Sequence, residues 1–302
     1  MIDSTFLEQL RKMNFLARRK VSGIYMGSRK SIRQGKGIEI ADHRDYYPGD
    51  DFRSIDWRLY GRTEKLYIRR FEEEKDLTLH ILIDSSASMN FSTTKMNKFD
   101  YSGSIGVGFA YIAMCNHEKF TSALYSDHIT GLIQTKKGKR NFFRMIEILN
   151  NAKLRGKTNL DSCMEQYTKI IKSKSFIIVI SDFIEPIESL RNGIYRIAKH
   201  SKEAILIQVL DPGEIYLRWS DDIKFEDMET SRFEIAYLSP EFKNRYRNRL
   251  NEHIFEIQKI CNDTGIEFFS ITTEKPVFNS FMNILRDETK ISRHMNKNVQ
   301  KI

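Results

Sequence analysis

Several features that define other protein classes are missing from this sequence. No stretch approaches the ~20 consecutive apolar residues of a membrane-spanning helix, and the N-terminus lacks the basic-then-apolar order of a signal peptide. The three cysteines among 302 residues are widely separated and form no Cys-x-x-Cys pair. We therefore expect reduced thiols in the core of a cytoplasmic protein without a transmembrane span.

Common catalytic motifs are missing as well. The sequence has no Gly-rich phosphate loop followed by Lys-Ser or Lys-Thr, which argues against ATP binding by that route. The segment Gly103-Ser104-Ile105-Gly106 is not the Gly-x-Ser-x-Gly turn of serine hydrolases. No internal repeat or low-complexity stretch appears. An enzyme of these familiar kinds is not indicated.

The net charge of +9 is concentrated at the two ends of the chain. Residues 1–36 hold nine Lys or Arg against two acids, and residues 289–302 hold four Lys or Arg and no acid. Because a nucleic-acid reader more often carries a basic face on its folded body, no nucleic acid is expected as a partner. The basic ends suit an acidic protein or an anionic membrane surface, and 289–302 could equally be a solvated tail.

A carboxylate and two hydroxyls follow one strongly apolar run. Residues 77–83 indicate a buried strand, and Asp84, Ser86 and Ser88 come directly after it. Ligands of open α/β sheets bind outside the carboxyl ends of strands. The oxygen donors suit Mg²⁺ or Mn²⁺ better than zinc. Taken alone, the pentapeptide is better explained as a turn that caps a helix.

Two later segments add donors of the same kind. Thr158 lies in a Gly-containing loop just before a helical segment, and Asp182 ends a second apolar run, 175–181. Both would reach the same edge of a parallel sheet as Asp84, Ser86 and Ser88.

This set, in this order, resembles the metal-ion-dependent adhesion site of von Willebrand factor A domains. That family has Asp-x-Ser-x-Ser, then a Thr in a Gly-x-Thr loop, then an Asp that ends a later strand. The resemblance implies that Ser86, Ser88 and Thr158 touch the metal, with Asp84 and Asp182 acting directly or through water. It also implies that a partner carboxylate fills one coordination position. The metal would be Mg²⁺, or alternatively Mn²⁺ or Ca²⁺.

Residues 39–57 are dense in charged and aromatic side chains around the turn at Pro48-Gly49. Arginine forks pair with carboxylates and stack on rings. The segment could therefore be an ion-pair network that orders a loop, or a surface for docking a partner. The candidate docking residues are Arg44, Tyr46, Asp50, Asp51, Arg53, Asp56 and Trp57.

The same segment, together with Leu66–Glu74, resembles the signature of the bacterial "domain of unknown function 58" family. Members place this signature just ahead of a von Willebrand A-like domain. Many also carry two N-terminal membrane helices, and their absence here favours a soluble, cytoplasmic form. The family resemblance further implies a MoxR-type AAA+ ATPase as partner, in a chaperone-like or metal-insertion system.

Helical and extended patterns alternate as a doubly wound α/β fold requires. We expect a mostly parallel sheet of the von Willebrand A or Rossmann-like kind over 77–290, with a small β insertion at 211–238. An N-terminal helix near 4–19 and the signature segment, within 1–76, should pack on it, and 291–302 should form a basic tail. Further helices are expected at 99–116, 142–149, 162–171, 187–200 and 240–261, and strands at 120–125, 130–133, 204–210 and 266–272.

These observations favour a non-enzymatic, metal-dependent protein-interaction module. The alternative is a Mg²⁺-dependent hydrolase or phosphoryl-transfer enzyme that uses Asp84 and Asp182. Phosphatases of the haloacid-dehalogenase type need Asp-x-Asp, whereas position 86 is Ser.

Overall fold

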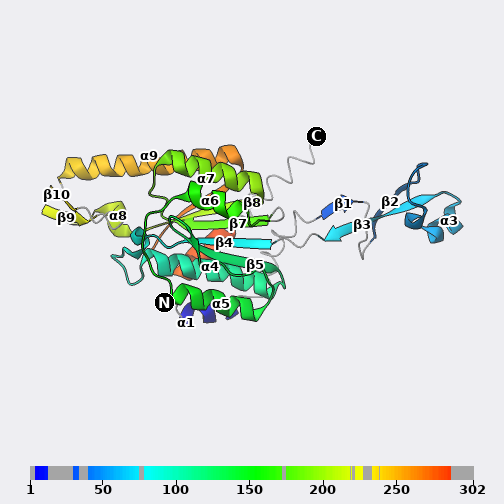
Figure 1. The fold of residues 1–302 in the computed structure, drawn as a ribbon, viewed down its shortest axis with the longest axis horizontal. Coiled ribbons are helices and arrows are strands. Elements are labelled where there is room, and N and C mark those ends of the chain that lie inside the picture. The colour runs from blue at the N-terminus through cyan, green and yellow to red at the C-terminus, as the bar shows by residue number, and fades with distance from the viewer. Residues whose placement is uncertain are drawn as a thin grey trace. The chain divides into compact units, whose positions relative to one another are not determined.

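The chain, described by a computed structural model, divides into two compact units (Figure 1). The first unit combines residues 1–14 with 77–291, and the second combines 15–76 with 292–302. The N-terminal helix therefore belongs with the large unit rather than with the signature segment. The structure describes residues 4–12, 30–33, 40–74, 78–171, 175–217, 219, 222–226, 233–237 and 239–286.

A six-stranded sheet in the order β11-β8-β7-β4-β5-β6 lies at the centre of the first unit. Its strands are parallel, except that β6 runs antiparallel to β5 at one edge. Counted along the chain, this is the 3-2-1-4-5-6 order of doubly wound folds. The predicted fold class is confirmed. The strands are β4 (Thr78–Asp84), β5 (Lys119–Tyr125), β6 (Ile129–Thr130), β7 (Ser175–Ser181), β8 (Ser201–Leu210) and β11 (Glu267–Thr272).

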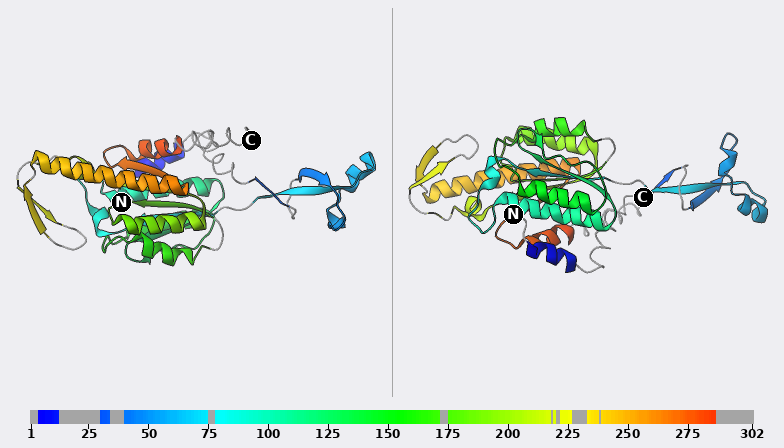
Figure 2. Two further views of the ribbon diagram at one scale, coloured as in Figure 1. Left: turned by 90° about the horizontal axis from the view of Figure 1, so that it is seen from above. Right: turned by 60° about the horizontal axis from the view of Figure 1, so that its bottom comes forward.

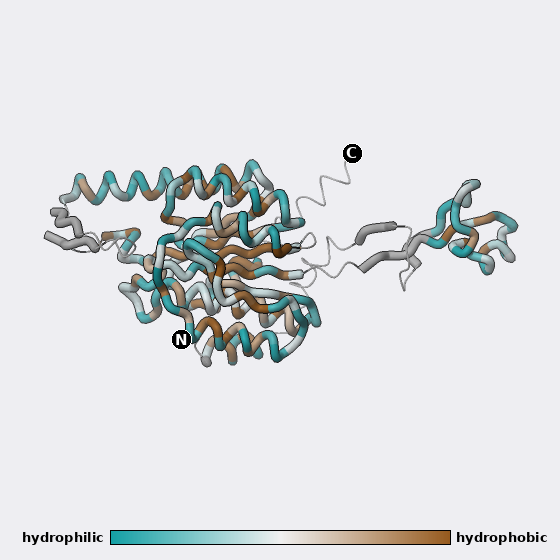
Figure 3. The backbone as a smooth tube through the Cα atoms, viewed as in Figure 1, coloured by the Kyte–Doolittle hydropathy of each residue, from teal (hydrophilic) through white to brown (hydrophobic). Residues whose placement is uncertain are grey.

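The two central strands, β4 and β7, are buried along their whole length. Most of their side chains are apolar, on both faces, as a strand between two helical layers requires. Figure 3 shows these strands as the hydrophobic interior of the unit. Strand β6 is shorter than the predicted 130–133, because Gly131 adopts φ +57° and ends the extended conformation.

Helices cover both faces of this sheet (Figure 2). On one face, Ile81 and Ile83 of β4 contact Gly106, where an added Cβ would come within 2.8 Å of Ile83. On the other face, Leu82 joins a core cluster with residues such as Leu160. Thus α4 packs closely on one side, beside α5, while α6, α7 and α9 pack on the other. Their bounds are α4 (Lys98–Cys115), α5 (Lys139–Asn150), α6 (Leu160–Thr168), α7 (Ile187–His200) and α9 (Pro240–Thr264).

The N-terminal helix α1 (Ser4–Lys12) uses its apolar face inside the first unit. Phe6 and Leu10 are buried, and the ring of Phe6 packs edge-on against Phe281 at 6.2 Å. Phe281 belongs to a helix described over 277–286, which also contacts α4 through Phe109. The predicted continuation of α1 to residue 19 lies outside the described residues. In the part of the chain that the structure covers, we find no helix with the length and apolarity needed to cross a membrane.

The segment between β8 and α9 begins with a short helix, α8 (Pro212–Tyr216). Its first turn is closed by a capping box between Asp211 and Glu214. An antiparallel pair of strands follows, β9 (Asp222–Glu226) with β10 (Phe233–Tyr237). The sequence suggested only β structure here, although Asp-Pro-Gly-Glu carries the cap signal that starts α8.

The second unit contains a three-stranded antiparallel sheet in the order β1-β3-β2. Its strands are β1 (Lys30–Arg33), β2 (Ile40–Asp45) and β3 (Tyr67–Glu74). Between β2 and β3 lie a turn with Gly49 at φ +109°, the 3-10 helix η1 (Phe52–Ser54) and the helix α3 (Trp57–Thr63). Ile55 and Ile68, both buried, pair across this connection.

Candidate metal site

Two aspartates end neighbouring strands at the centre of the sheet. Asp84 is the last residue of β4, and Asp182 directly follows β7. The strand order reverses between these strands, because β4 continues to β5 on one side and β7 to β8 on the other. Ligands of doubly wound sheets bind at such a switch point. Both carboxylates are buried there.

The carboxylate of Asp84 is held by three hydrogen bonds. Its Oδ1 accepts from the backbone N–H of Ser86 at 2.8 Å. Its Oδ2 accepts from Ser181 Oγ at 2.6 Å and from Thr158 Oγ1 at 3.1 Å. Ser181 was not among the predicted site residues, and its only sequence signal is its place next to Asp182. These bonds fix the orientation of Asp84 from three separate segments.

The two serines after Asp84 link it to Asp182. Ser86 Oγ and Ser88 Oγ are 3.0 Å apart, and Ser88 Oγ donates to Asp182 Oδ2 at 2.9 Å. Ser86 stands at the N-cap position of the 3-10 helix η2 (Ala87–Asn90), yet its side chain makes no capping hydrogen bond. The sequence alone left open the simpler explanation that Ser86 caps a helix. The structure shows that capping does not account for the Ser86 hydroxyl.

Backbone hydrogen bonds bring the Thr158 loop to the same place. The N–H of Ala87 donates to Gly156 O at 3.1 Å, and the N–H of Arg155 donates to Ser85 O at 3.1 Å. Gly156 has φ +84°, a conformation that residues with a Cβ rarely adopt. The structure thus brings all five predicted residues together: Asp84, Ser86, Ser88, Thr158 and Asp182.

The two carboxylates differ in their electrostatic surroundings. Burial raises the pKa of Asp84 well above its usual range, and the negative charge of Asp182 raises it further. Burial acts on Asp182 in the same direction, but the ammonium of Lys98, together with hydrogen bonds from Ile184 and Ser88, outweighs it and leaves the pKa of Asp182 below its ordinary value. Asp182 therefore has a positive partner in the protein, whereas a cation added beside Asp84 would relieve its unfavourable burial.

Lys98 and Glu214 complete the cluster, and no sequence motif pointed to either. Lys98, the first residue of α4, donates to Asp182 Oδ2 at 2.8 Å and to Glu214 Oε1 at 2.5 Å. Burial alone would lower the pKa of Lys98, but the two carboxylates raise it above its ordinary value. For Glu214, in contrast, burial raises the pKa, although Lys98 opposes that shift.

The donor set fits a divalent cation. The five predicted residues offer two carboxylates and three hydroxyls, which are hard oxygens suited to Mg²⁺, Mn²⁺ or Ca²⁺. Hydroxyls would have to supply part of the shell, since no group of three or more His, Cys, Asp or Glu among the described residues could hold a metal. When all three carboxylates are ionised, Asp84, Asp182 and Glu214 set against Lys98 leave two negative charges, which one divalent ion would balance.

Three aspartates of the signature segment have local structural partners in the second unit. Asp50 pairs with Arg44 at 2.7 Å. Asp51 caps η1 by accepting from the N–H of Arg53, and Asp56 caps α3. Asp56 also lies 2.9 Å from His43 Nε2. These contacts fit the interpretation of the segment as an ion-pair network that orders a loop.

The aromatic side chains of the same segment are exposed. Trp57 is 59% exposed and contacts Tyr60 edge-on at 6.1 Å. Phe52 is 65% exposed and lies 5.6 Å from the ring of Tyr46, while Tyr47 lies beneath Arg44. Of these, Phe52 and Tyr60 were not singled out in the sequence. Aromatic and arginine side chains are enriched in protein interfaces, so this surface suits docking.

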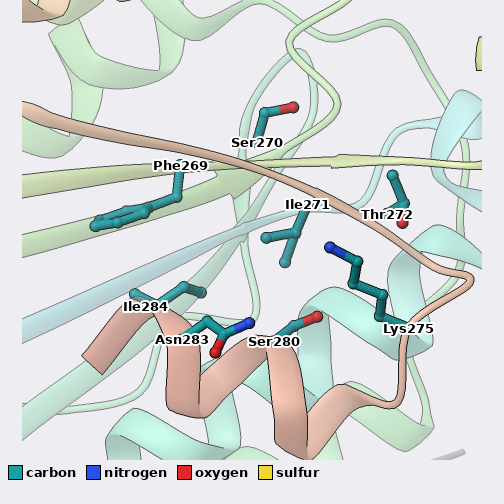
Figure 4. A pocket seen from close by; sticks show the side chains of 8 residues that line it. All are labelled: Phe269, Ser270, Ile271, Thr272, Lys275, Ser280, Asn283 and Ile284. Atoms are coloured by element: carbon teal, nitrogen blue, oxygen red, sulfur yellow. The ribbon is translucent and has the colours of Figure 1, made fainter. Parts of the chain in front are cut away.

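A surface pocket lies between β11 and the helix at 277–286 (Figure 4). Lys275 and Thr272 stand at one end, and Phe269 and Ile284 at the other. Its lining includes none of the five predicted ligands. The pocket is therefore separate from the cluster at β4 and β7.

The strand order and the helices on both faces define the first unit as a doubly wound α/β domain. Residues 42–255 match the family described as "Protein of unknown function DUF58". The chain belongs to this family, as its signature segment predicted. It is 21% identical over 276 residues to the uncharacterized protein Rv1480 of Mycobacterium tuberculosis, covering 90% of this chain and 86% of that protein.

Solved structures similar to this chain include BatB and the VWA domain of SpRpn10. BatB from Bacteroides thetaiotaomicron is 12% identical, with a TM-score of 0.44, over 72% of this chain and 99% of that chain. The VWA domain of SpRpn10 is 13% identical, with a TM-score of 0.42, over 69% of this chain and 95% of that chain.

Proposed function

We propose that this chain is a non-enzymatic protein-interaction module that binds a partner carboxylate through a divalent metal, Mg²⁺ by preference. The supporting observation is the convergence of Asp84, Thr158 and Asp182 with two serines at the switch point of the sheet. They come from three segments far apart in sequence and offer only hard oxygens. The two negative charges that the cluster would carry with Asp84 ionised, which a divalent ion would balance, add to this support.

Each residue has a distinct part in this proposal. Ser86, Ser88 and Thr158 would contact the ion, with Asp84 and Asp182 acting directly or through water. Ser181 orients Asp84, and Lys98 orients Asp182. When bound, the ion would supply a concentrated positive charge for an Asp or Glu of the partner.

We propose a MoxR-type AAA+ ATPase as the partner, in the cytoplasm, and this part of the proposal is supported by the family resemblance alone. We further propose that the exposed aromatic surface of the second unit makes a separate contact with it. Trp57, with Arg53 nearby in sequence, has the side-chain chemistry of interface hot spots. Changes at Trp57 should then weaken partner capture without altering metal affinity.

The test is capture of the ATPase by the purified full chain, with Mg²⁺ and with chelator. Wild-type protein and Ser102→Ala, which alters a buried hydroxyl with no hydrogen-bond partner in the described structure, should capture it only with Mg²⁺. Thr158→Ala should lose most of the capture. Equal recovery with and without chelator would remove the metal from the proposed function.

The same preparations distinguish the enzyme alternative. The module should show no turnover of a generic phosphoester such as p-nitrophenyl phosphate in the presence of Mg²⁺. Turnover that disappears in Asp84→Ala would overturn the non-enzymatic assignment and favour a hydrolase.

A further inference from the structure

Lys98 carries a positive charge into the interior of the first unit, beside the candidate metal site. Its side chain is 0% exposed, and its Nζ lies 6.0 Å from the ring centre of Phe91. Lysine is almost never fully buried unless it is paired. Here it is paired twice, with Asp182 and with Glu214.

The two partners of Lys98 belong to different parts of the molecule. Asp182 is one of the five predicted ligands. Glu214 lies in α8, where its Oε2 also accepts from the N–H of Asp211 at 3.0 Å. The ammonium is therefore shared between the site and a carboxylate that is not a predicted ligand.

Every oxygen of Asp182 already has a donor in the protein. Oδ1 accepts from the N–H of Ile184 at 3.2 Å, while Oδ2 accepts from both Ser88 and Lys98. Asp84, in contrast, accepts from uncharged donors alone among the residues that the structure describes. Of the two aspartates, Asp182 is thus the one whose charge is compensated and whose position is fixed by a cation of the chain itself.

We propose that Lys98 is an internal counter-cation of the site, which positions Asp182 and weakens the binding of a divalent ion, and that Glu214 moderates this effect. The inference rests on the proposed metal-dependent function and specifies how ion affinity in that site is set. Since like charges repel strongly at short range in a poorly solvated interior, the ammonium disfavours a nearby divalent ion. Glu214 draws part of that positive charge away from Asp182.

Mn²⁺ titration calorimetry on the full-length chain tests the proposal through changes of opposite sign. Lys98→Met should bind Mn²⁺ about tenfold or more tightly than wild type, because the repulsion is removed. Glu214→Gln should bind it about threefold more weakly, because Lys98 then acts on Asp182 alone. Lys139→Met removes an equal charge from the exposed start of α5 and should change affinity less than about twofold.

Thermal unfolding provides a second measurement. Without divalent ions, Lys98→Met should melt at a lower temperature than wild type, because Asp182 and Glu214 lose their counter-charge. Saturating Mn²⁺ should raise its melting temperature more than that of wild type. If Lys98→Met does not fold, Glu214→Gln alone tests the proposal. Unchanged or tighter Mn²⁺ binding by Glu214→Gln then contradicts it.

The outcomes separate this inference from the proposed function. Mn²⁺ binding to wild type with equal or weaker binding to Lys98→Met overturns the role of Lys98 and leaves the metal site standing. Binding to Lys98→Met but not to wild type supports Lys98 as the resident cation and overturns the metal-dependent function. Binding to neither protein overturns both.

Discussion

The carboxylates of the two units are used in contrasting ways. In the second unit, Asp51 accepts from the backbone N–H of Arg53, only two residues away, and this hydrogen bond is exposed. At the sheet edge, Asp84 is buried and bonds Ser181, which lies 97 positions away along the chain. Local bonds of the first kind order a segment, whereas distant bonds of the second kind assemble a site. The second unit is therefore a scaffold for exposed aromatic side chains, whereas the first unit holds a buried cluster of charged groups.

The largest difference between the units should appear when one aspartate is removed from each. Asp182→Ala leaves Lys98 buried with Glu214 alone and should lower the free energy of unfolding of the first unit by about 3 kcal/mol or more. Asp51→Ala loses one capping bond and should cost the second unit about 1 kcal/mol. Urea unfolding in metal-free buffer measures both. Similar losses of unfolding free energy in the two variants would contradict the proposed difference between the two units.

The units should also lose stability in different pH ranges. Burial lowers the pKa of His80 to about 4, and its Nδ1 lies 2.8 Å from the Tyr167 hydroxyl. Because the unfolded chain binds this proton at about pH 6.5, His80 should cost the first unit up to ~3 kcal/mol as pH falls from 6.5 to 4. In the second unit, the hydrogen bond from His43 lowers the pKa of Asp56, so the corresponding loss begins only below about pH 4.

Urea unfolding of wild type and His80→Gln between pH 7 and 4.5 measures the first of these effects. The variant should lose less stability over this range than wild type. The same slope in both proteins would show that other groups cause the pH dependence.

Alanine substitutions at two helical glycines, one in each unit, should change the free energy of unfolding by smaller amounts and in opposite directions. An alanine at Gly106 of α4 would press on Ile83, where the added Cβ comes within 2.8 Å of its Cδ1, and should destabilise by about 1–3 kcal/mol. An alanine at Gly61 of α3 meets open space and should stabilise the second unit by up to about 1 kcal/mol. Circular dichroism during urea unfolding measures both. A loss of stability at Gly61 would indicate a contact that α3 needs.

Much of the sheet follows from the sequence, because its central strands are continuous apolar runs. The runs that became β4 and β7 also placed Asp84 and Asp182 at their ends. The outer strand β6 was less predictable, since its length depends on the conformation of Gly131. Helix α8 carried its own capping signal, but the surrounding pattern favoured strands.

The candidate site was predictable where a motif spans neighbouring residues and was missed where pairing is distant. Asp84, Ser86 and Ser88 share one short motif. Lys98 meets Asp182 across 84 positions and Glu214 across 116, and nothing in the sequence marks that lysine as buried. A charged residue at the start of a helix is ordinarily solvent-exposed, so only the packed structure reveals it.

The most direct test of the central claim is Mn²⁺ titration calorimetry of the wild-type chain beside Thr158→Ala and the control Ser102→Ala. We expect one ion to bind wild type and Ser102→Ala with equal affinity, and Thr158→Ala to bind at least about tenfold more weakly while remaining folded. Equal affinity in all three proteins, or no binding to wild type, would contradict the assignment of Asp84, Ser86, Ser88, Thr158 and Asp182 as a metal site.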